Sequence, residues 1–347
     1  MLKKSLISLA TAIVGFLAYM FTHNSNSSFG LPQPLCLSQF YQDTTPELIN
    51  PKLKNNSYPL CYEGFSLNYS GITKTPLWVA EKLNPERLRS KIKRENNFHE
   101  EERLPTHARA LLSDYKNSGF DRGHMAPNGD MGDKASQYDS FSLANMIPQH
   151  PDNNQNTWRE IEETTRTMVT KYRLEAYVVT GGAFLKRTVK PIKKGHDVLV
   201  PSHVYKAVYF PQIGMASAYL SVNDDSRQTD MISICALEEK TGINIFPQLE
   251  EHIKRQVYAF PLRASQVKAN KQPVLKQQDL VSQCAPQVSA AQIKNTQQQF
   301  IIGKNYNSVL NLTQHQKTTQ DKPLSPELDF NALALAAVHW FKTQENK

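Results

Sequence analysis

The chain of 347 residues is long enough to enclose one large hydrophobic core or two smaller ones. Its 39% hydrophobic and 21% charged residues suit a globular protein and exclude a chain that is disordered throughout. The net charge of +8 favours a polyanionic partner, either nucleic acid or an anionic membrane surface, although many exported proteins are also basic.

Residues 1–23 predict a signal peptide or an N-terminal anchor. Lys3 and Lys4 precede an apolar run over residues 5–21, which is shorter than a membrane-spanning helix prefers. No small-x-small cleavage site follows, so an uncleaved anchor stays open, and a buried N-terminal helix is the alternative. After a polar linker over residues 24–35, we expect the rest of the protein to lie outside the cytosol, in the periplasm or the extracellular space.

Four cysteines behind an export signal predict disulfide bonds. They are Cys36, Cys61, Cys235 and Cys284, and three pairings are possible. We favour Cys36 with Cys61, because the short loop between them is the easiest to close. No two cysteines form a CxxC pair, so the sequence gives no support to a zinc or thioredoxin-like site.

The segment from residue 36 to residue 262 alternates apolar runs with turns and predicts one compact domain. The expected strands cover residues 77–80, 175–180, 203–210 and 215–222. The second should end at Gly181-Gly182. The last two should form a hairpin, because a proline and a glycine three residues apart separate them.

Residues 263–347 differ in composition and predict an extension without catalytic chemistry. The part up to residue 300 is rich in Gln, Lys, Ser and Ala, which suits a linker or a surface helix. A short helix is expected over residues 328–341, after two prolines.

A helix is also expected from Asn154 to Tyr172. Side chains recur at helical spacing to form one face, made by Trp158, Ile161, Thr165, Met168, Val169 and Tyr172. Asn154 and Glu162 would lie within roughly 80° of each other around the axis, so both can face one site. Arg166 follows Glu162 by four residues and is close enough to pair with it.

Residues before this helix complete a set that suits phosphodiester hydrolysis, which needs a base, a cation and positive groups. His124 is the candidate base, because imidazole titrates near neutral pH. Mg²⁺ keeps several waters, so the amide oxygen of Asn154 could anchor it. Positive charge would come from Arg122 and from the run Arg87, Arg89, Lys91, Lys93 and Arg94.

Each of these residues also has a commoner structural role. A single histidine is usually a surface or satisfied residue, and an asparagine near a helix start is usually a cap. Glu162 with Arg166 would usually form a solvated pair, and the basic run an exposed helical face. The functional interpretation therefore depends on their occurring together.

Taken together, the segments resemble the DNA/RNA non-specific endonuclease family, the group of the Serratia nuclease and mitochondrial endonuclease G. The resemblance covers about residues 61–261. It is strongest at Asp121-Arg122-Gly123-His124 followed by Met125-Ala126-Pro127, with support from residues 73–78, 145–149, 179–181 and 237–242. It implies an α+β fold with a central antiparallel sheet flanked by helices. It also implies a ββα-metal finger, in which two short strands precede the helix near Asn154.

The resemblance also implies roles for individual residues. His124 matches the general base, Asn154 the single direct magnesium ligand, and Glu162 the acid that orients a metal-bound water. Arg94 matches an arginine that contacts the phosphate, and Arg89 or Lys93 could serve instead. Three further positions match the family's site region, namely Arg122, Asn145 and Arg166. Mg²⁺ is the expected cofactor, with Mn²⁺ or another divalent cation as the alternative.

The expected activity is a magnesium-dependent, sugar-non-specific endonuclease that hydrolyses phosphodiester bonds of DNA and RNA. DNA and RNA are the expected partners, and the N-terminus could add membrane anchoring. Two other classes stay open: a catalytically inactive nucleic-acid-binding or envelope protein of the same fold, and a phosphoesterase acting on small diesters. The sequence does not give the oligomeric state.

Overall fold

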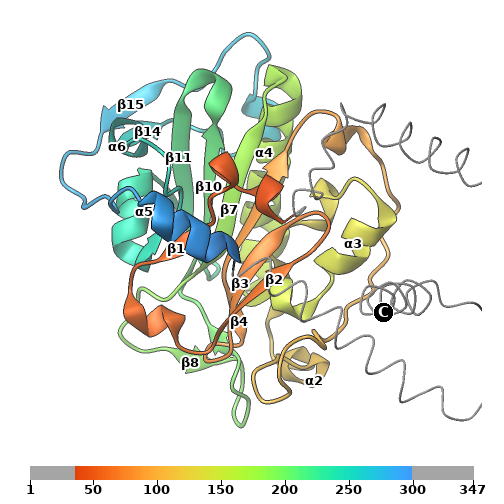
Figure 1. Ribbon diagram of the computed structural model, residues 1–347. Helices are drawn as coiled ribbons and strands as arrows, with labels where there is room; N and C mark the ends of the chain where they lie inside the picture. Colours follow the sequence, from red (N-terminus) through yellow and green to blue (C-terminus); the bar gives the residue numbers. More distant parts are fainter. Residues whose placement is uncertain (1–35, 299–347) are drawn as a thin grey trace, which may run out of the picture. The chain divides into compact units, whose positions relative to one another are not determined.

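The computed structural model describes residues 36–298, in which a seven-stranded sheet is the largest element (Figure 1). Its strand order is β12-β11-β10-β7-β4-β3-β2, and every neighbouring pair is antiparallel. The strands are β2 Ser57–Cys61, β3 Ser66–Ser70, β4 Thr75–Leu83, β7 Ala176–Ala183, β10 His203–Phe210, β11 Met215–Val222 and β12 Thr229–Ile232. The predicted central antiparallel sheet with flanking helices is thereby confirmed.

The predicted β-hairpin is also confirmed, as strands β10 and β11. A single 3₁₀ turn, η8 Pro211–Ile213, joins them, and Gly214 follows it with φ +59°. Glycine adopts this left-handed conformation without the steric cost that a Cβ would add. The turn therefore forms where the proline and glycine indicated it.

Strand β7 extends further than the sequence indicated, because it continues through Gly181 and Gly182. The Tyr205 side chain crosses the sheet over Gly181, and its hydroxyl donates a hydrogen bond to the Leu77 carbonyl at 2.9 Å. A Cβ at Gly181 would lie 2.6 Å from both that carbonyl and the Tyr205 hydroxyl. Glycine here makes room for a cross-strand tyrosine and does not mark the end of the strand.

Both faces of the sheet are covered, since side chains alternate between two hydrophobic clusters. Val79 packs in a cluster with Trp158 and Ile161 on one face. Its neighbours Trp78 and Ala80 pack on the other face, against residues of helix α5 Ile234–Thr241. The strands are therefore buried on both sides, with α4 and α5 supplying side chains to different clusters (Figure 1).

The predicted ββα unit is present on the first of these faces. Strand β5 Asp121–His124 pairs with β6 Met146–Gln149, and the chain then enters the helical segment η7 Asn153–Trp158 and helix α4 Arg159–Tyr172. The predicted helix is thus confirmed, but its first turn is π-helical. This wider turn changes the angular spacing that an α-helix would give between Asn154 and Glu162.

The described chain also contains smaller elements, and residues 290–298, in the segment predicted as a linker or a surface helix, are helical. The short strands are β1 Glu47–Leu48, β8 Lys190–Pro191, β9 Leu199–Val200, β13 Ile243–Asn244, β14 Gln256–Tyr258 and β15 Leu275–Gln278. The short helices are α2 Leu112–Tyr115, α3 Lys134–Ser140 and α6 Glu251–Lys254. Single 3₁₀ turns are η1 Leu37–Gln39, η2 Tyr41–Asp43, η3 Pro51–Lys54, η4 Arg87–Arg89, η5 Asn128–Asp130, η6 Leu143–Asn145 and η9 Ala264–Gln266.

Disulfide bonds join Cys36 to Cys61 and Cys235 to Cys284, which confirms the pairing favoured for the first two cysteines. The second bond fixes part of the predicted Gln-rich linker to helix α5. The same part also contributes strand β15, which pairs with β14, so residues 275–284 belong to the folded unit and are not a linker. Few large apolar side chains were needed, because a strand pair and a disulfide hold the segment.

The predicted signal or anchor over residues 1–23, the linker over residues 24–35 and the helix over residues 328–341 lie outside the described residues. Within residues 36–298, no helix has the length and apolar character needed to cross a bilayer.

Gly181→Ala should lower the free energy of unfolding by about 1–3 kcal/mol, because its Cβ would displace Tyr205 or the Leu77 backbone. Denaturant unfolding followed by circular dichroism measures this. Gly132→Ala is the matched control, since its Cβ would meet no atom nearer than 3.4 Å. Equal stability of the two variants would contradict the close approach described for Tyr205.

Candidate active site

A cleft of about 850 Å³ lies beside the ββα unit and brings together five of the seven predicted site residues. They are Arg94, Arg122, His124, Asn154 and Glu162. They come from a loop, from strand β5, from the π-helical turn and from helix α4. Residues far apart in the chain therefore meet at one surface, as the sequence predicted.

Strand β5 holds His124 at the cleft through close contact with strand β6. Gly123 lies opposite Ile147, and a Cβ on Gly123 would overlap the Gln149 side chain. Gln149 in turn donates from Nε2 to Asn153 Oδ1 at 2.6 Å, which connects the strand pair to the π-helical turn. The glycine before His124 is thus required by packing between the two strands.

Asp121 fixes the orientation of Asn154. The Asn154 Nδ2 donates to Asp121 Oδ2 at 2.9 Å, and Gln155 Nε2 donates to the same oxygen at 2.9 Å. Within the described residues, Asn154 Oδ1 accepts no hydrogen bond, so this oxygen is available to a ligand. We assigned Asp121 no role from the sequence, although its place at the start of the Asp-Arg-Gly-His motif was a signal.

The His124 imidazole lies between two aromatic rings. Its centroid is 5.7 Å from that of Phe98 and 5.0 Å from that of Phe141, the latter at 88°. Its Nε2 is buried and has no hydrogen-bond partner among the described residues. Burial lowers the pKa of His124 to about 3, with help from the charges of Arg94 and Arg122, while a hydrogen bond to the Arg122 main chain acts in the opposite direction. The imidazole is therefore neutral at physiological pH.

Four cations line the cleft: Lys116 and Arg159, which sequence analysis did not single out, and the predicted Arg94 and Arg122. The Arg122 guanidinium lies 4.0 Å above the centre of the Phe98 ring. Arg94 donates from Nε to Asn96 Oδ1 at 2.8 Å, and its guanidinium lies 5.3 Å from the centre of the Phe141 ring. The same aromatic side chains thus support Arg94, Arg122 and the imidazole.

The remainder of the basic run does not form the expected exposed helical face. Its regular part is the single 3₁₀ turn η4, followed by chain without helix or strand up to residue 98. Arg87 turns inward and its side chain is only 14% exposed. Arg89, Lys91 and Lys93 do not line the cleft, so Arg94 is the member of the run that reaches it.

Glu162 reaches the cleft from helix α4, but its expected pairing with Arg166 is wrong. Arg166 instead donates from Nη1 to Asp130 Oδ1 at 2.7 Å, and it does not line the cleft. Burial raises the pKa of Glu162 to about 7, while the charges of Lys206 and Arg166 act to lower it. Arg166 therefore influences Glu162 through its charge and not through a direct ion pair.

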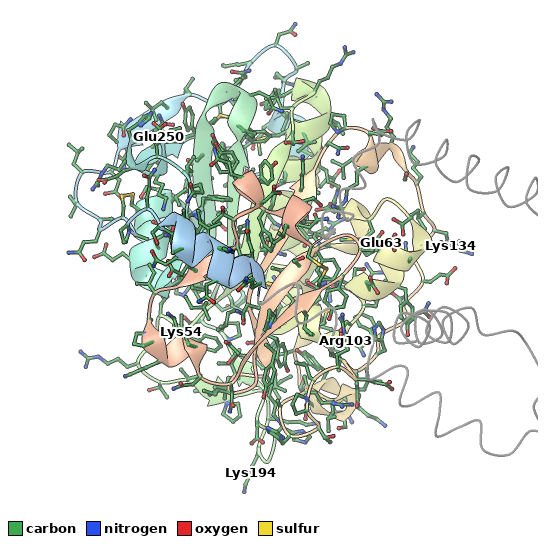
Figure 2. All side chains as sticks on the ribbon, in the orientation of Figure 1. Lys54, Glu63, Arg103, Lys134, Lys194 and Glu250 are labelled. Atoms are coloured by element: carbon green, nitrogen blue, oxygen red, sulfur yellow. A yellow bond between two sulfur atoms is a disulfide. The ribbon has the colours of Figure 1, made fainter. Side chains whose placement is uncertain are left out.

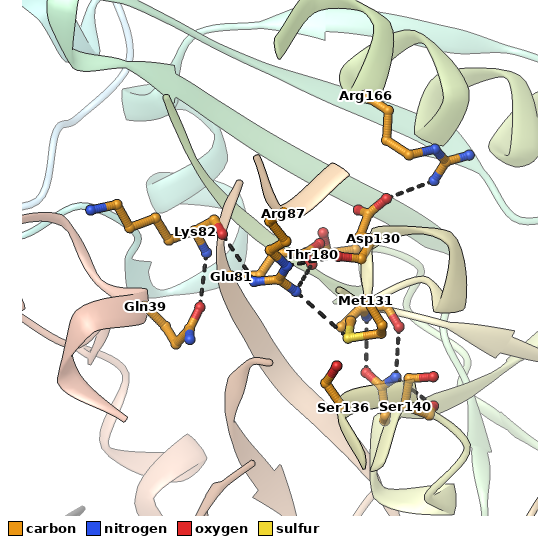
Figure 3. Close-up of polar contacts among 12 residues, drawn as sticks. Gln39, Glu81, Lys82, Arg87, Asp130, Met131, Ser136, Ser140, Arg166 and Thr180 are labelled. Atoms are coloured by element: carbon orange, nitrogen blue, oxygen red, sulfur yellow. Dashed lines mark hydrogen bonds and ion pairs between the residues drawn. The ribbon is translucent and has the colours of Figure 1, made fainter. Parts of the chain in front are cut away.

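Beneath helix α4 lies a group of buried charges that the sequence did not reveal (Figure 3). We call Glu81, Arg87, Asp130, Arg166 and Lys206 the buried cluster, of which Figure 3 labels the first four. Glu81, Asp130 and Lys206 are fully buried, whereas Arg87 and Arg166 are partly exposed. Arg87 donates from Nε to the Asp130 carbonyl at 2.7 Å, and its Nη2 lies 3.5 Å from Glu81 Oε2. Lys206 donates to Thr180 Oγ1 at 2.8 Å. Burial first, and then the charge of Asp130, raise the pKa of Glu81 to about 8.

Asn145, predicted to belong to the region of the site, does not line the cleft but lies beside the chain that follows His124. Its side chain is fully buried, and its Oδ1 accepts from the Ala126 amide at 2.9 Å. Its Nδ2 donates to the carbonyls of Ala126 and Ser140, each at 2.9 Å. With all these bonds used internally, Asn145 holds the chain that follows His124 and is not free to contact a substrate.

The donor atoms at the cleft fit a hydrated divalent cation. Within residues 36–298, no group of three His, Cys, Asp or Glu side chains is arranged to hold a metal ion. The free Oδ1 of Asn154 and the carboxylate of Glu162 nevertheless share the cleft. A cation that keeps most of its water, as Mg²⁺ does, needs only one or two such oxygens from the protein.

Residues 45–252 match the family model described as DNA/RNA non-specific endonuclease. Human mitochondrial endonuclease G is 39% identical over 164 residues, which cover 44% of this chain and 54% of the relative. A nuclease of Nostoc sp. is 31% identical over 230 residues, covering 59% of this chain and 81% of the relative. The chain thus spans about half the length of the first curated relatives it matches.

Among solved structures, the crystal structure of the EndoG/EndoGI complex has a similar fold. The TM-score is 0.50 at 25% sequence identity, and the match covers 56% of this chain and 87% of the other. The α+β architecture described above is therefore shared with a known nuclease structure.

His124 should stay neutral in the folded protein when the solution is acidified to about pH 5, because burial and two arginines oppose its protonation. NMR titration of the imidazole measures the pKa of His124. The urea-unfolded chain is the control, because histidine in an unfolded chain has a pKa of about 6.5. Since folding lowers this pKa, its contribution to stability is present above ~6.5 and is lost as the pH falls towards 3. A folded-state midpoint near 6.5 would refute the burial argument.

Proposed function

The chain belongs to the DNA/RNA non-specific endonuclease family, and on this premise we propose that it is a divalent-metal-dependent endonuclease that hydrolyses DNA and RNA. One observation carries the proposal: a neutral imidazole, a free amide oxygen, a carboxyl group and two arginines line a single cleft. These are the groups needed to activate water, hold a cation and bind a phosphodiester.

In the proposed mechanism, His124 is the general base. Its neutral imidazole accepts the proton of a water molecule as that water attacks the phosphorus. Arg94 and Arg122 bind the non-bridging oxygens of the phosphate and hold it against the imidazole. Asn154 Oδ1 would hold the cation, Mg²⁺ or Mn²⁺, which when bound stabilises negative charge on the phosphate and the leaving oxygen. Glu162, once ionised, accepts hydrogen bonds from water in the cleft and orients it.

Substrate binding also changes the strength of the base. The charges of Arg94 and Arg122 help to keep the pKa of His124 low in the free protein. A bound phosphate offsets those charges, so the pKa of His124 rises while the effect of burial remains. His124 therefore becomes a stronger base when a phosphodiester occupies the cleft.

We also propose that the protein works outside the cytosol. Two disulfide bonds within residues 36–298 support this, because such bonds persist in oxidising compartments. The charged and apolar pattern of residues 1–23 supports export, and it leaves a cleaved signal and a retained anchor as alternatives.

A plasmid-nicking assay tests the proposed activity. In the presence of Mg²⁺, the wild-type protein should convert supercoiled DNA to nicked and linear forms. Cleavage should stop when EDTA is added, because EDTA removes the metal ion. His124→Ala should lower kcat by about 10²–10⁴-fold, because it removes the base, and should still bind DNA. His252→Ala, which changes an exposed histidine away from the cleft, is the control and should keep full activity.

Two results of this assay would argue against the proposal. Near-normal turnover by His124→Ala would remove His124 as the base. A wild-type protein that binds DNA but cuts neither DNA nor RNA with any divalent metal would favour a catalytically inactive binding protein of the same fold.

The orientation of Asn154 should determine how well the metal is used. Asn154→Ala removes the proposed ligand, and Asp121→Ala releases the Asn154 amide from its hydrogen bond. Both should raise the Mg²⁺ concentration that gives half-maximal nicking, the second by about 10–100-fold, as expected when a ligand loses its orienting partner. Gln155→Ala is the matched control, because it removes only the other donor to Asp121. If Asp121→Ala keeps the wild-type metal response, Asp121 does not orient the ligand.

A further inference from the structure

A strongly basic hairpin extends from the folded unit outside the cleft. We call residues 185–200, which include strands β8 and β9, the basic hairpin. Its cations are Lys186, Arg187, Lys190, Lys193 and Lys194, whereas Asp197 is its single acidic residue. Figure 1 shows the hairpin near helix α2, and Figure 2 shows Lys194 at its outer end. All of these cations except Lys193 are exposed.

Polar contacts fix the loop between strands β8 and β9 to the wall of the cleft. The Lys193 Nζ donates to the carbonyls of Ser113 and Lys116, at 2.7 and 2.8 Å. His196 Nδ1 lies 2.5 Å from Asp114 Oδ1. These partners belong to helix α2 and the residue after it, and Tyr115 and Lys116 of the same segment line the cleft. The loop of the hairpin therefore lies beside the wall of the cleft.

Apolar packing holds the hairpin at the same place. Ile192 and Val198 are buried in a cluster with Tyr115, Met146 and Phe98. Two of these, Tyr115 and Phe98, line the cleft, and Met146 pairs with His124 in the strand ladder. The position of the exposed cations is thus tied to the position of the candidate base.

We propose that the basic hairpin is a second contact surface for nucleic acid, which binds phosphates of the polymer beyond the bond that is cut. This proposal rests on the proposed function, and it describes how the candidate active site would bind a long substrate. A cleft of about 850 Å³ is of the size that encloses a small ligand, so a polymer must leave it. Duplex DNA carries about one charge per 1.7 Å of its axis, so the next phosphates meet whatever surface borders the cleft.

The composition of the hairpin favours contacts to the backbone of the polymer and not to its bases. Residues 185–200 contain no Phe, Tyr or Trp on which a base could stack. Among the described residues, none of Arg187, Lys190 and Lys194 forms an ion pair, so their charges are available to phosphates. Contacts of this kind carry no sequence information, which suits a nuclease without sequence preference.

The test compares a long and a small substrate in a triple variant, Arg187→Gln, Lys190→Gln and Lys194→Gln. Lys186 is kept, because it influences the nearby Asp224. The control triple, Lys52→Gln, Lys54→Gln and Lys276→Gln, removes the same charge from exposed residues that do not line the cleft. Long duplex DNA and a small chromogenic phosphodiester are the two substrates.

For long DNA, the hairpin variant should raise KM by about tenfold relative to the control triple, with kcat little changed. The slope of log KM against log salt concentration should fall by about 0.9 for each phosphate that the hairpin no longer neutralises. Hydrolysis of the small diester should be unchanged, because that substrate fits within the cleft.

Other outcomes would overturn the proposal. If the two triple variants have the same KM and salt slope on DNA, the hairpin does not contact the polymer. If the small diester loses activity as well, the hairpin acts through the structure of the cleft. If the variant is impaired only in binding to vesicles of phosphatidylserine and phosphatidylcholine, the hairpin serves a membrane.

The proposed function can fail separately from this inference. A wild-type protein that hydrolyses neither substrate would refute the nuclease activity. Fluorescence anisotropy of labelled duplex DNA, with EDTA present, would then still compare the two triple variants. Equal affinity in that measurement would refute the hairpin as a nucleic-acid contact.

Discussion

The candidate site depends on one structural constraint, the attachment of the β5–β6 strand pair to the π-helical turn before α4. Three side-chain hydrogen bonds make this attachment: Asn154 and Gln155 donate to Asp121, and Gln149 donates to Asn153. They join the strand that carries the candidate base to the turn that carries the candidate metal ligand. π-helical turns are rare and are frequently found at functional sites. Here it places Asn154 where Asp121 can hold its amide, so that the amide oxygen remains free.

The charges of the buried cluster act on the pKa of Glu162 at the cleft. Burying charges costs desolvation energy, and ion pairs recover that cost only in part. Lys206 and Glu81 occupy inward positions of strands, on the face of the sheet that packs against α4, where apolar side chains would stabilise the fold more simply. The cations of the cluster, Lys206 and Arg166, favour the ionised form of Glu162, which burial alone would disfavour. The cations of the cluster thus oppose the effect of burial on the pKa of a carboxyl group that lines the cleft.

Local features of the sequence predicted individual elements, whereas the resemblance implied the sheet and most of the site. Runs of apolar and β-branched residues bounded by turn residues predicted strands β4, β7, β10 and β11, and helical periodicity predicted helix α4. The resemblance in the motif at residues 121–124 and in the helix correctly brought His124, Asn154 and Glu162 to one cleft. The predicted ion-pair partner of Arg166 was wrong. The spacing of four residues suggested Glu162, but Arg166 pairs with Asp130 from a distant segment of the chain. Gly181 was misjudged for the same reason, since its role depends on Tyr205, which only the tertiary structure brings near it.

The free cleft combines two groups whose pKa values are shifted away from their catalytic forms. Burial and the charges of two arginines lower the pKa of His124, which makes it a weak base. Burial raises the pKa of Glu162, which disfavours its ionised form. A phosphate anion beside the arginines strengthens His124, and positive charge held at Asn154 favours the ionised Glu162. In the proposed mechanism, each ligand therefore favours the reactive form of one of the two groups. Because both groups line the same cleft, a phosphodiester and a cation that bind there together would act on both pKa values.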